Sequence, residues 1–311
     1  MLEANAEQYQ LFNANINGAL VLADGDTQGE YPDYGYFSNR NTASRRDRTS
    51  TSARTPAGST MTDIKSVTLS RFLNDDQTIS ALRMQGINIA GLSAKIAQKF
   101  TEDTIRNAFT SALSALAGTL LKASTTYNNV ATASSSNTIS LNHCWDTLQK
   151  LGDAAPLVKA MVLHSYQATA LKKALGASSA LGQVIGAGVV MDDSLSGHFL
   201  RPVFVTDNSV LKVDKTSSSG AYDTYRTLFL TEAAASIKKM ETVPVMAYED
   251  RAYDNTMLGC TGEYELELGV KGFSYTVSSA NPTDGTLATT SSWTQRTTSV
   301  KNGPGAVLIT R

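Results

Sequence analysis

Apolar side chains recur at steps of three to five residues between residues 89 and 122, and alanines fill the gaps between them. This spacing places them on one side of an α-helix, so the sequence predicts a single long helix with at most one break. At a rise of about 1.5 Å per residue, such a helix extends about 51 Å. Its predicted role is packing against a hydrophobic core. The apolar stripe consists of Leu92, Ile96, Phe100, Ile105, Phe109, Leu113, Leu116 and Leu120.

Shorter helix and strand patterns alternate after this helix. An uncharged polar stretch at residues 123–140 separates the two regions and is the best candidate for a boundary between subdomains. The alternation beyond it predicts a compact α/β or α+β domain. Helices are predicted at 141–151 and 166–175, and strands at 159–164, 202–206 and 225–230.

Residues 263–268 alternate strictly between acidic and apolar side chains, which predicts a strand with two different faces. The apolar face carries Tyr264, Leu266 and Leu268, and the acidic face carries Glu263, Glu265 and Glu267. Neighbouring carboxylates on one face lie about 7 Å apart and repel one another unless they are solvated or paired. The acidic face is therefore either solvated or a docking surface for cations of another chain. Further strands are predicted at 272–275 and 305–310.

The formal net charge of −1 over 311 residues hides a strong local asymmetry. Residues 1–37 contain six acidic and no basic residues, a net charge of −6. Residues 38–60 contain five arginines and one aspartate, a net charge of +4, and no large apolar side chain. This segment is either a solvated loop or an arm that becomes ordered against a neighbouring molecule, because arginine suits bidentate pairing with carboxylates. The arginines are Arg40, Arg45, Arg46, Arg48 and Arg54.

The residues on either side of the arginine-rich segment favour the second interpretation, an arm that becomes ordered against a neighbouring molecule. An aromatic stretch at residues 31–37 precedes it, and the β-branched stretch Ile64–Arg71 after it predicts a strand. Both faces of this strand mix polar and apolar side chains, so neither is interpreted as a core face. The sequence therefore predicts a long hairpin that projects from its own subunit.

Catalytic, metal and cofactor sites are not predicted. His164 and Ser165 end one predicted strand and Asp207 follows another, but no G-x-S-x-G motif marks a nucleophile. The two cysteines, Cys144 and Cys260, have no zinc-like spacing and cannot form a disulfide framework. Near-neutral charge argues against a sequence-specific nucleic-acid reader, and no apolar run is long enough to span a membrane.

The order of these segments resembles the major capsid proteins of tailed double-stranded DNA bacteriophages, which have the Hong Kong 97-like fold. Several short stretches are similar to members of that family, and their order is more specific than any one alone. They are Ser44–Ser52, Leu151–Pro156, Lys159–Ser165, Arg201–Asp207, Tyr248–Arg251, Gly272–Tyr275, Asn281–Thr283 and Trp293.

The resemblance implies an α+β fold divided into five parts. It implies an N-terminal arm at 1–35, an extended β-hairpin loop at 36–72, and a peripheral domain with a long spine helix at 73–138. An axial α/β domain follows at 139–245. Residues 246–311 supply the returning peripheral strands and the C-terminus. In such shells the extended loop lies over a neighbouring subunit, so Arg45, Arg46, Arg48 and Arg54 would pair with carboxylates such as Glu263, Glu265 and Glu267 of that neighbour. Arg40 is a further candidate for an intersubunit contact.

The implied function is structural: self-assembly into hexamers and pentamers of an icosahedral head that encloses double-stranded DNA. The implied location is the virion, with assembly in the cytoplasm of the bacterial host. Implied partners are other copies of the chain, a portal protein, a decoration protein and the DNA, which is contacted without sequence preference. The region before the arm is too short for a fused scaffolding domain, which implies a separate scaffolding protein or a matured chain. No membrane partner and no cofactor are expected.

One departure from some family members is informative. Some members cross-link their subunits through a lysine on the extended loop, whereas residues 36–60 here contain no lysine. The sequence therefore predicts a shell without autocatalytic isopeptide bonds.

Three alternatives stay open from the sequence alone. An encapsulin-like nanocompartment shell would share the fold but would enclose enzyme cargo instead of DNA. A flagellin-like filament protein would explain the abundance of Ser, Thr and Asn, but it requires helical heptads at both termini. A serine hydrolase using Ser165 would react with a broad activity probe.

Overall fold

The computed structural model describes a mixed α+β protein built on two sheets and one long helix. It describes residues 17–24, 33–37, 49, 61–78, 89–123, 126–131, 138–175, 184–186, 189–213, 222–250, 257–277, 279, 281–297, 299 and 302–311. The five arginines of the predicted loop lie outside these residues.

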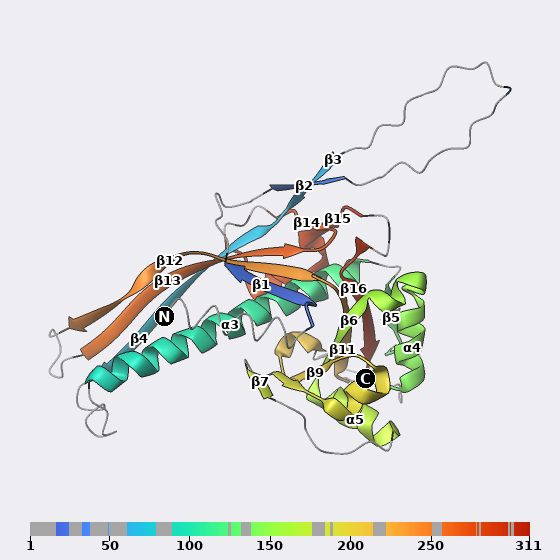
Figure 1. The fold of residues 1–311 in the computed structure, drawn as a ribbon, viewed down its shortest axis with the longest axis horizontal. Helices are drawn as coiled ribbons and strands as arrows, with labels where there is room; N and C mark the ends of the chain where they lie inside the picture. The colour runs from blue at the N-terminus through green and yellow to red at the C-terminus, as the bar shows by residue number, and fades with distance from the viewer. Residues whose placement is uncertain are drawn as a thin grey trace.

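The long helix, α3 (Ile89–Lys122), runs along the first sheet and reaches the second (Figure 1). It is unbroken over the range predicted from the sequence. From Phe100 onward its apolar stripe is buried, and Phe109, Leu113 and Leu116 are almost fully enclosed. The small residues between them let neighbouring elements approach closely. A Cβ atom on Gly118 would lie 2.5 Å from the carbonyl oxygen of Leu287.

The first sheet has six strands in the described part of the chain, in the order β1-β12-β13-β14-β15, with β4 paired to β13. Its longest members are antiparallel, and β4 follows β13 in register from Val67 opposite Leu268 to Thr78 opposite Met257. The strands are β1 (Leu20–Asp24), β4 (Val67–Thr78), β12 (Ala235–Asp250), β13 (Met257–Val270), β14 (Phe273–Tyr275) and β15 (Trp293–Gln295). The short helix α7 (Asp284–Leu287) and the 3-10 turn η3 (Thr290–Ser292) connect the last two and pack on α3.

The second sheet has eight strands in the described residues, in the order β5-β16-β11-β6-β9-β8-β7, with β10 paired to β11. Within it β6 and β9 are parallel neighbours, and Met161 pairs with Val203. The strands are β5 (Tyr127–Asn129), β6 (Val158–Leu163), β7 (Val184–Gly186), β8 (Val189–Met191), β9 (Val203–Thr206), β10 (Lys212–Val213), β11 (Thr224–Thr231) and β16 (Gly305–Thr310).

Alternating residues of the second sheet enter two different apolar cores. Met161 and Leu163 pack with the residues of three helices on one face, whereas Ala160 and Val162 join the core that contains α3. This period of two is what a strand buried on both faces requires. The three helices are α4 (Leu141–Gln149), α5 (Ser165–Leu175) and α6 (Asp193–Phe199). Two 3-10 turns, η1 (Gly152–Leu157) and η2 (Ser209–Leu211), complete this unit.

A separate two-stranded hairpin consists of β2 (Asp33–Phe37) and β3 (Met61–Lys65), and Figure 1 shows it beside the first sheet. The Lys65 N–H donates to Ser274 Oγ of β14 at 3.0 Å, which anchors the base of the hairpin. The arginine-rich segment connects these two strands along the chain.

Most predicted elements are confirmed, but the interpretation of Ile64–Arg71 is wrong. The stretch is not one projecting strand with two mixed faces, because β3 ends at Lys65 and β4 starts at Val67. In β4, Val67 and Leu69 are buried in the core of the subunit. The break at Ser66 was not visible in the sequence, and it separates the hairpin base from a strand of the first sheet.

Candidate intersubunit contact surfaces

The three glutamates predicted as one docking face occupy different environments. Glu263 is exposed and Glu265 is half-buried, but Glu267 is only 2% exposed. Ser66 Oγ donates to Glu267 Oε1 at 2.7 Å, and Ser70 Oγ donates to Glu265 Oε1 at 3.1 Å. A uniformly solvated acidic face is therefore not what the structure shows. Only Glu263 and, in part, Glu265 are accessible to another chain.

The serines and glutamates form a polar seam between β4 and β13, outside the apolar core. Their partners lie about 200 positions apart in the sequence, which is why the sequence did not reveal them. On the opposite side of β13, Lys238 of β12 is in register with Glu267. Because a buried charge needs polar or charged partners, the Glu267 carboxylate is committed to contacts within its own subunit.

A second polar cluster ties β4 to α3 and was also missed. Arg71 Nη2 lies 3.1 Å from Asp284 Oδ1, and Ser111 Oγ donates to the same oxygen at 2.7 Å. Nearby, Asn107 Nδ2 donates to the Tyr264 hydroxyl at 2.9 Å. Burial raises the pKa of the Tyr264 hydroxyl above its ordinary value. The cluster holds the helix against the sheet, which is a structural role.

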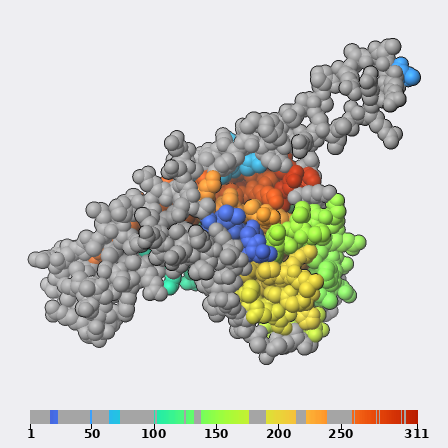
Figure 2. All heavy atoms as spheres, viewed as in Figure 1, coloured from blue at the N-terminus to red at the C-terminus, as the bar shows by residue number. Residues whose placement is uncertain are grey.

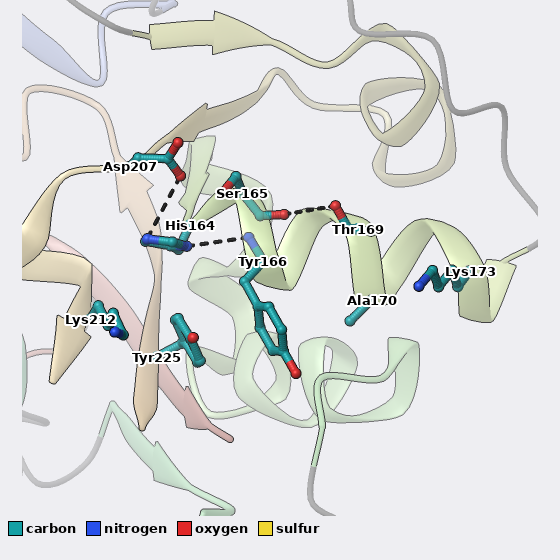
Figure 3. Close-up of a pocket in the computed structure, with 9 residues that line it drawn as sticks. All are labelled: His164, Ser165, Tyr166, Thr169, Ala170, Lys173, Asp207, Lys212 and Tyr225. Atoms are coloured by element: carbon teal, nitrogen blue, oxygen red, sulfur yellow. Dashed lines mark hydrogen bonds and ion pairs between the residues drawn. The ribbon is translucent and has the colours of Figure 1, made fainter. Parts of the chain in front are cut away.

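The residues considered for a hydrolase do meet in space, at the carboxyl ends of β6 and β9. His164 Nε2 lies 3.7 Å from Asp207 Oδ1, and the Tyr166 N–H donates to His164 Nδ1 at 3.2 Å (Figure 3). Both imidazole nitrogens therefore face groups other than the Ser165 hydroxyl. Because a serine nucleophile needs an adjacent base, this geometry does not activate Ser165.

An open pocket of about 640 Å³ surrounds these residues. One wall is a stacked aromatic pair, Tyr166 and Tyr225, whose ring centroids are 4.9 Å apart. The rim carries Lys173 of α5 and Lys212 of β10, as Figure 3 shows. We call this feature the tyrosine pocket. It is lined by His164, Ser165, Tyr166, Thr169, Ala170, Lys173, Asp207, Lys212 and Tyr225.

Large apolar side chains project at the other end of the same strands. Leu157 directly precedes β6 and is 47% exposed, and Leu200 lies just before β9 and is 90% exposed. Trp145 of α4 is 50% exposed and packs against Phe199, with ring centroids 6.3 Å apart. We call Trp145, Leu157 and Leu200 the leucine surface. In Figure 2 the green and yellow segments that carry them form neighbouring parts of one surface.

The described residues offer no metal site, and the thiol of Cys144 is not reactive. Among them, no group of three or more His, Cys, Asp or Glu side chains could hold a metal ion. Burial raises the pKa of the Cys144 thiol to about 12, so the reactive thiolate is suppressed. In the same part of the chain, no helix is long and apolar enough to cross a membrane.

The fold is that of bacteriophage capsid proteins. The chain is similar to the capsid of Ralstonia phage GP4, with 9% identity, coverage of 94% of this chain and 87% of that chain, and a TM-score of 0.53. It is similar to a structure of Mycobacterium phage Adephagia, with 9% identity, 95% and 88% coverage, and a TM-score of 0.52. It is also similar to the capsid of Cyanophage Pam1, with 8% identity, coverage of 91% of this chain and 85% of that chain, and a TM-score of 0.51. No curated protein matches the sequence.

Residues 1–307 match the model of the Gp13-like family, described as major capsid protein 13-like, and the chain belongs to this family. It is therefore a structural protein of the bacteriophage capsid shell, located in the virion, and it is not an enzyme. The predicted Hong Kong 97-like fold is confirmed. The filament and hydrolase alternatives are wrong, and membership favours a phage head over an encapsulin-like compartment.

Proposed function

We propose that copies of this chain assemble into hexamers and pentamers of an icosahedral phage head that encloses double-stranded DNA. The observation that carries this proposal is the family match over nearly the whole chain. The net charge of −1 supports contact with DNA over a large inner surface without strong binding, because strong cationic binding would hinder movement of the genome.

We infer from the role of the shell that assembly takes place in the bacterial cytoplasm together with a portal protein. Either a separate scaffolding protein assists it or the chain is a matured form, and a decoration protein is a further candidate partner. The division into arm, extended loop, peripheral domain and axial domain, at the boundaries predicted from the sequence, belongs to the same proposal.

We propose that the arginine-rich segment pairs with acidic side chains of a neighbouring subunit. The exposed Glu263 and the half-buried Glu265 are its partners, whereas Glu267 is retained inside its own subunit by Ser66. Paired carboxylates in a partly desolvated interface contribute more than exposed surface pairs, which typically contribute about 0–1 kcal/mol. The segment contributes Arg40, Arg45, Arg46, Arg48 and Arg54.

Charge reversal tests this pairing. The triple variant Arg45→Glu, Arg46→Glu, Arg48→Glu should lose most shells, as counted by negative-stain microscopy and by sedimentation of assembled particles. Adding Glu263→Arg and Glu265→Arg should restore part of the yield, because the pair is rebuilt with exchanged signs. The control is the triple lysine variant at the same positions, which keeps the charge and should still assemble. Normal shells from the triple glutamate variant would refute the pairing.

A further inference from the structure

Leu200 combines two features that are unfavourable in an isolated subunit. Its side chain is 90% exposed, and its backbone has φ 54° and ψ 30°, the left-handed conformation that favours glycine. A bulky residue rarely adopts this conformation, and such strain concentrates at functional positions. Neither folding nor solubility benefits from a leucine here, which points to a contact made outside the subunit.

The rest of the leucine surface is held in place around this residue. Arg201 Nη2 donates to the carbonyl oxygen of Ala155 at 2.9 Å, which fixes the turn that carries Leu157 beside the Leu200 turn. Phe199, next to Leu200, packs against Trp145. A preorganised apolar projection loses little side-chain entropy on binding, which is the property of an interface anchor.

The tyrosine pocket lies at the opposite end of the same two strands. Leu157 directly precedes β6 and His164 directly follows it, while Leu200 precedes β9 and Asp207 follows it. Because β6 and β9 are parallel, both projecting leucines mark one end of the sheet and the pocket marks the other. Six residues of strand span about 20 Å, so the two surfaces cannot touch within one subunit.

The two surfaces are complementary in chemistry. The pocket volume of about 640 Å³ falls in the range of about 300–1,000 Å³ that encloses small ligands, and its stacked tyrosines offer an apolar wall. At the pocket rim, Lys173 is exposed and forms no ion pair with any residue in the described part of the chain. Beside Trp145, Asp146 is exposed on α4. Lys212 on the same rim pairs with Asp223 at 3.1 Å, and the exposed Asp207 carboxylate lies 3.7 Å from His164. Lys173 is therefore the rim cation that can meet Asp146 of another copy.

We propose that the leucine surface of one subunit inserts into the tyrosine pocket of the next copy of the chain. Leu200 packs against Tyr166, and Asp146 approaches Lys173. Two different surfaces at opposite ends of one sheet make a head-to-tail contact, which closes into a ring when the rotation between neighbours is a whole fraction of a turn. This inference rests on the proposed hexamers and pentamers, and it assigns the contact that joins their members.

Disulfide trapping tests the contact in assembled shells. The double variant Leu200→Cys, Thr169→Cys places one thiol on the projection and one on the pocket rim. A disulfide forms only when the two Cβ atoms approach within about 4.5 Å. We expect a ladder of covalent multiples of 33.2 kDa on non-reducing denaturing gels, ending at rings of five and six. Each single cysteine variant is the control for the native cysteines and should give no ladder.

The outcomes separate this inference from the proposed function. If the wild-type protein forms no shells, the proposed function fails. If the double cysteine variant forms shells but gives no ladder above the single variants under mild oxidation, the leucine-to-pocket contact is overturned while the capsid function stands.

Leu200→Gly provides a second test that does not depend on oxidation. Glycine adopts the left-handed conformation without strain, so the variant subunit should unfold at the same temperature as the wild type or at a higher one. Shell yield should nevertheless fall at least tenfold. The charge swap Asp146→Lys with Lys173→Asp should assemble better than either single variant. Wild-type shell yield from Leu200→Gly would overturn the contact.

Discussion

At the scale of single residues, Gly118 shows how closely the long helix approaches the segment between β14 and β15. A Cβ atom here would lie 2.5 Å from the backbone oxygen of Leu287 and 3.2 Å from Cδ1 of Trp293. The neighbouring backbone cannot rotate away as a flexible side chain would. The absence of a side chain at this position is therefore a packing requirement.

We predict that Gly118→Ala destabilises the subunit by about 1–3 kcal/mol, the usual cost of overpacking a core. The matched control is Gly197→Ala, because Gly197 is also in a helix but has open space around it. There the substitution should stabilise by about 0.5–1 kcal/mol through helix propensity. Denaturant unfolding of the dissociated subunits measures both changes. Equal stability of the two variants would contradict the packing argument.

Residue-scale chemistry was the part least accessible from the sequence. The alternation of Glu263–Leu268 predicted a strand whose apolar side chains share one face, and Tyr264, Leu266 and Leu268 are all buried. It could not predict that Ser66, about 200 positions away, donates a hydrogen bond to the carboxylate of Glu267. Alternation indicates which face of a strand a residue occupies, but the residues that bury that face come from another part of the chain.

At the scale of elements, a buried ion pair joins α5 to the start of α6. Lys172 Nζ lies 2.5 Å from Asp192 Oδ2, and the Asp192 side chain is fully buried. Asp192 also caps α6, because its Oδ1 accepts the Leu195 N–H at 3.1 Å. One carboxylate thus fixes two helices that support both the leucine surface and the tyrosine pocket.

We predict that Asp192→Ala destabilises the subunit by about 3–5 kcal/mol, because it leaves the Lys172 charge buried without this partner. Asp192→Asn keeps a capping oxygen and should cost about 1 kcal/mol less, the usual contribution of a helix cap. Thermal and denaturant unfolding followed by circular dichroism measures the difference. If both variants match the wild type, the pair has no part in joining α5 to α6.

The elements themselves were largely predictable, with informative exceptions. The apolar residues of α3 recur at helical spacing within its own sequence, so its bounds were predicted correctly. The strand β5 was missed because Tyr127–Asn129 is short and polar and depends on its parallel partner β16. The faces of β4 were misinterpreted because Ile64 and Lys65, which belong to β3, were assigned to the same strand as Val67 and Leu69. No residue type in the sequence marks the break at Ser66.

At the scale of the whole molecule, the shell must be held together without covalent links if the sequence-based prediction is correct. No lysine occurs at residues 36–60. We predict that shells boiled in detergent and reductant give a single band at 33.2 kDa. Mass spectrometry of the digested shells should detect no isopeptide bond between subunits. A ladder that survives reduction would show that a lysine elsewhere supplies a cross-link.

The arrangement of the contact surfaces could be predicted only in outline. Segment order indicated the fold family, but the leucine surface and the tyrosine pocket depend on the parallel pairing of β6 with β9. Leu157 and His164 lie seven positions apart in the sequence, yet they mark opposite ends of the sheet. Such a relation follows from topology and is not encoded in any local pattern.

Both sheets are completed by strands from distant parts of the sequence. In the first, Leu20 of β1 pairs with Ala235 of β12, and in the second, Val307 of β16 pairs with Tyr127 of β5. Chains dominated by such distant pairings fold slowly, because loop-closure entropy is lost before the contacts form. Neither sheet is complete until strands from both halves of the chain are available. We therefore expect the supply of subunits that can join a shell to depend on folding kinetics as well as on synthesis.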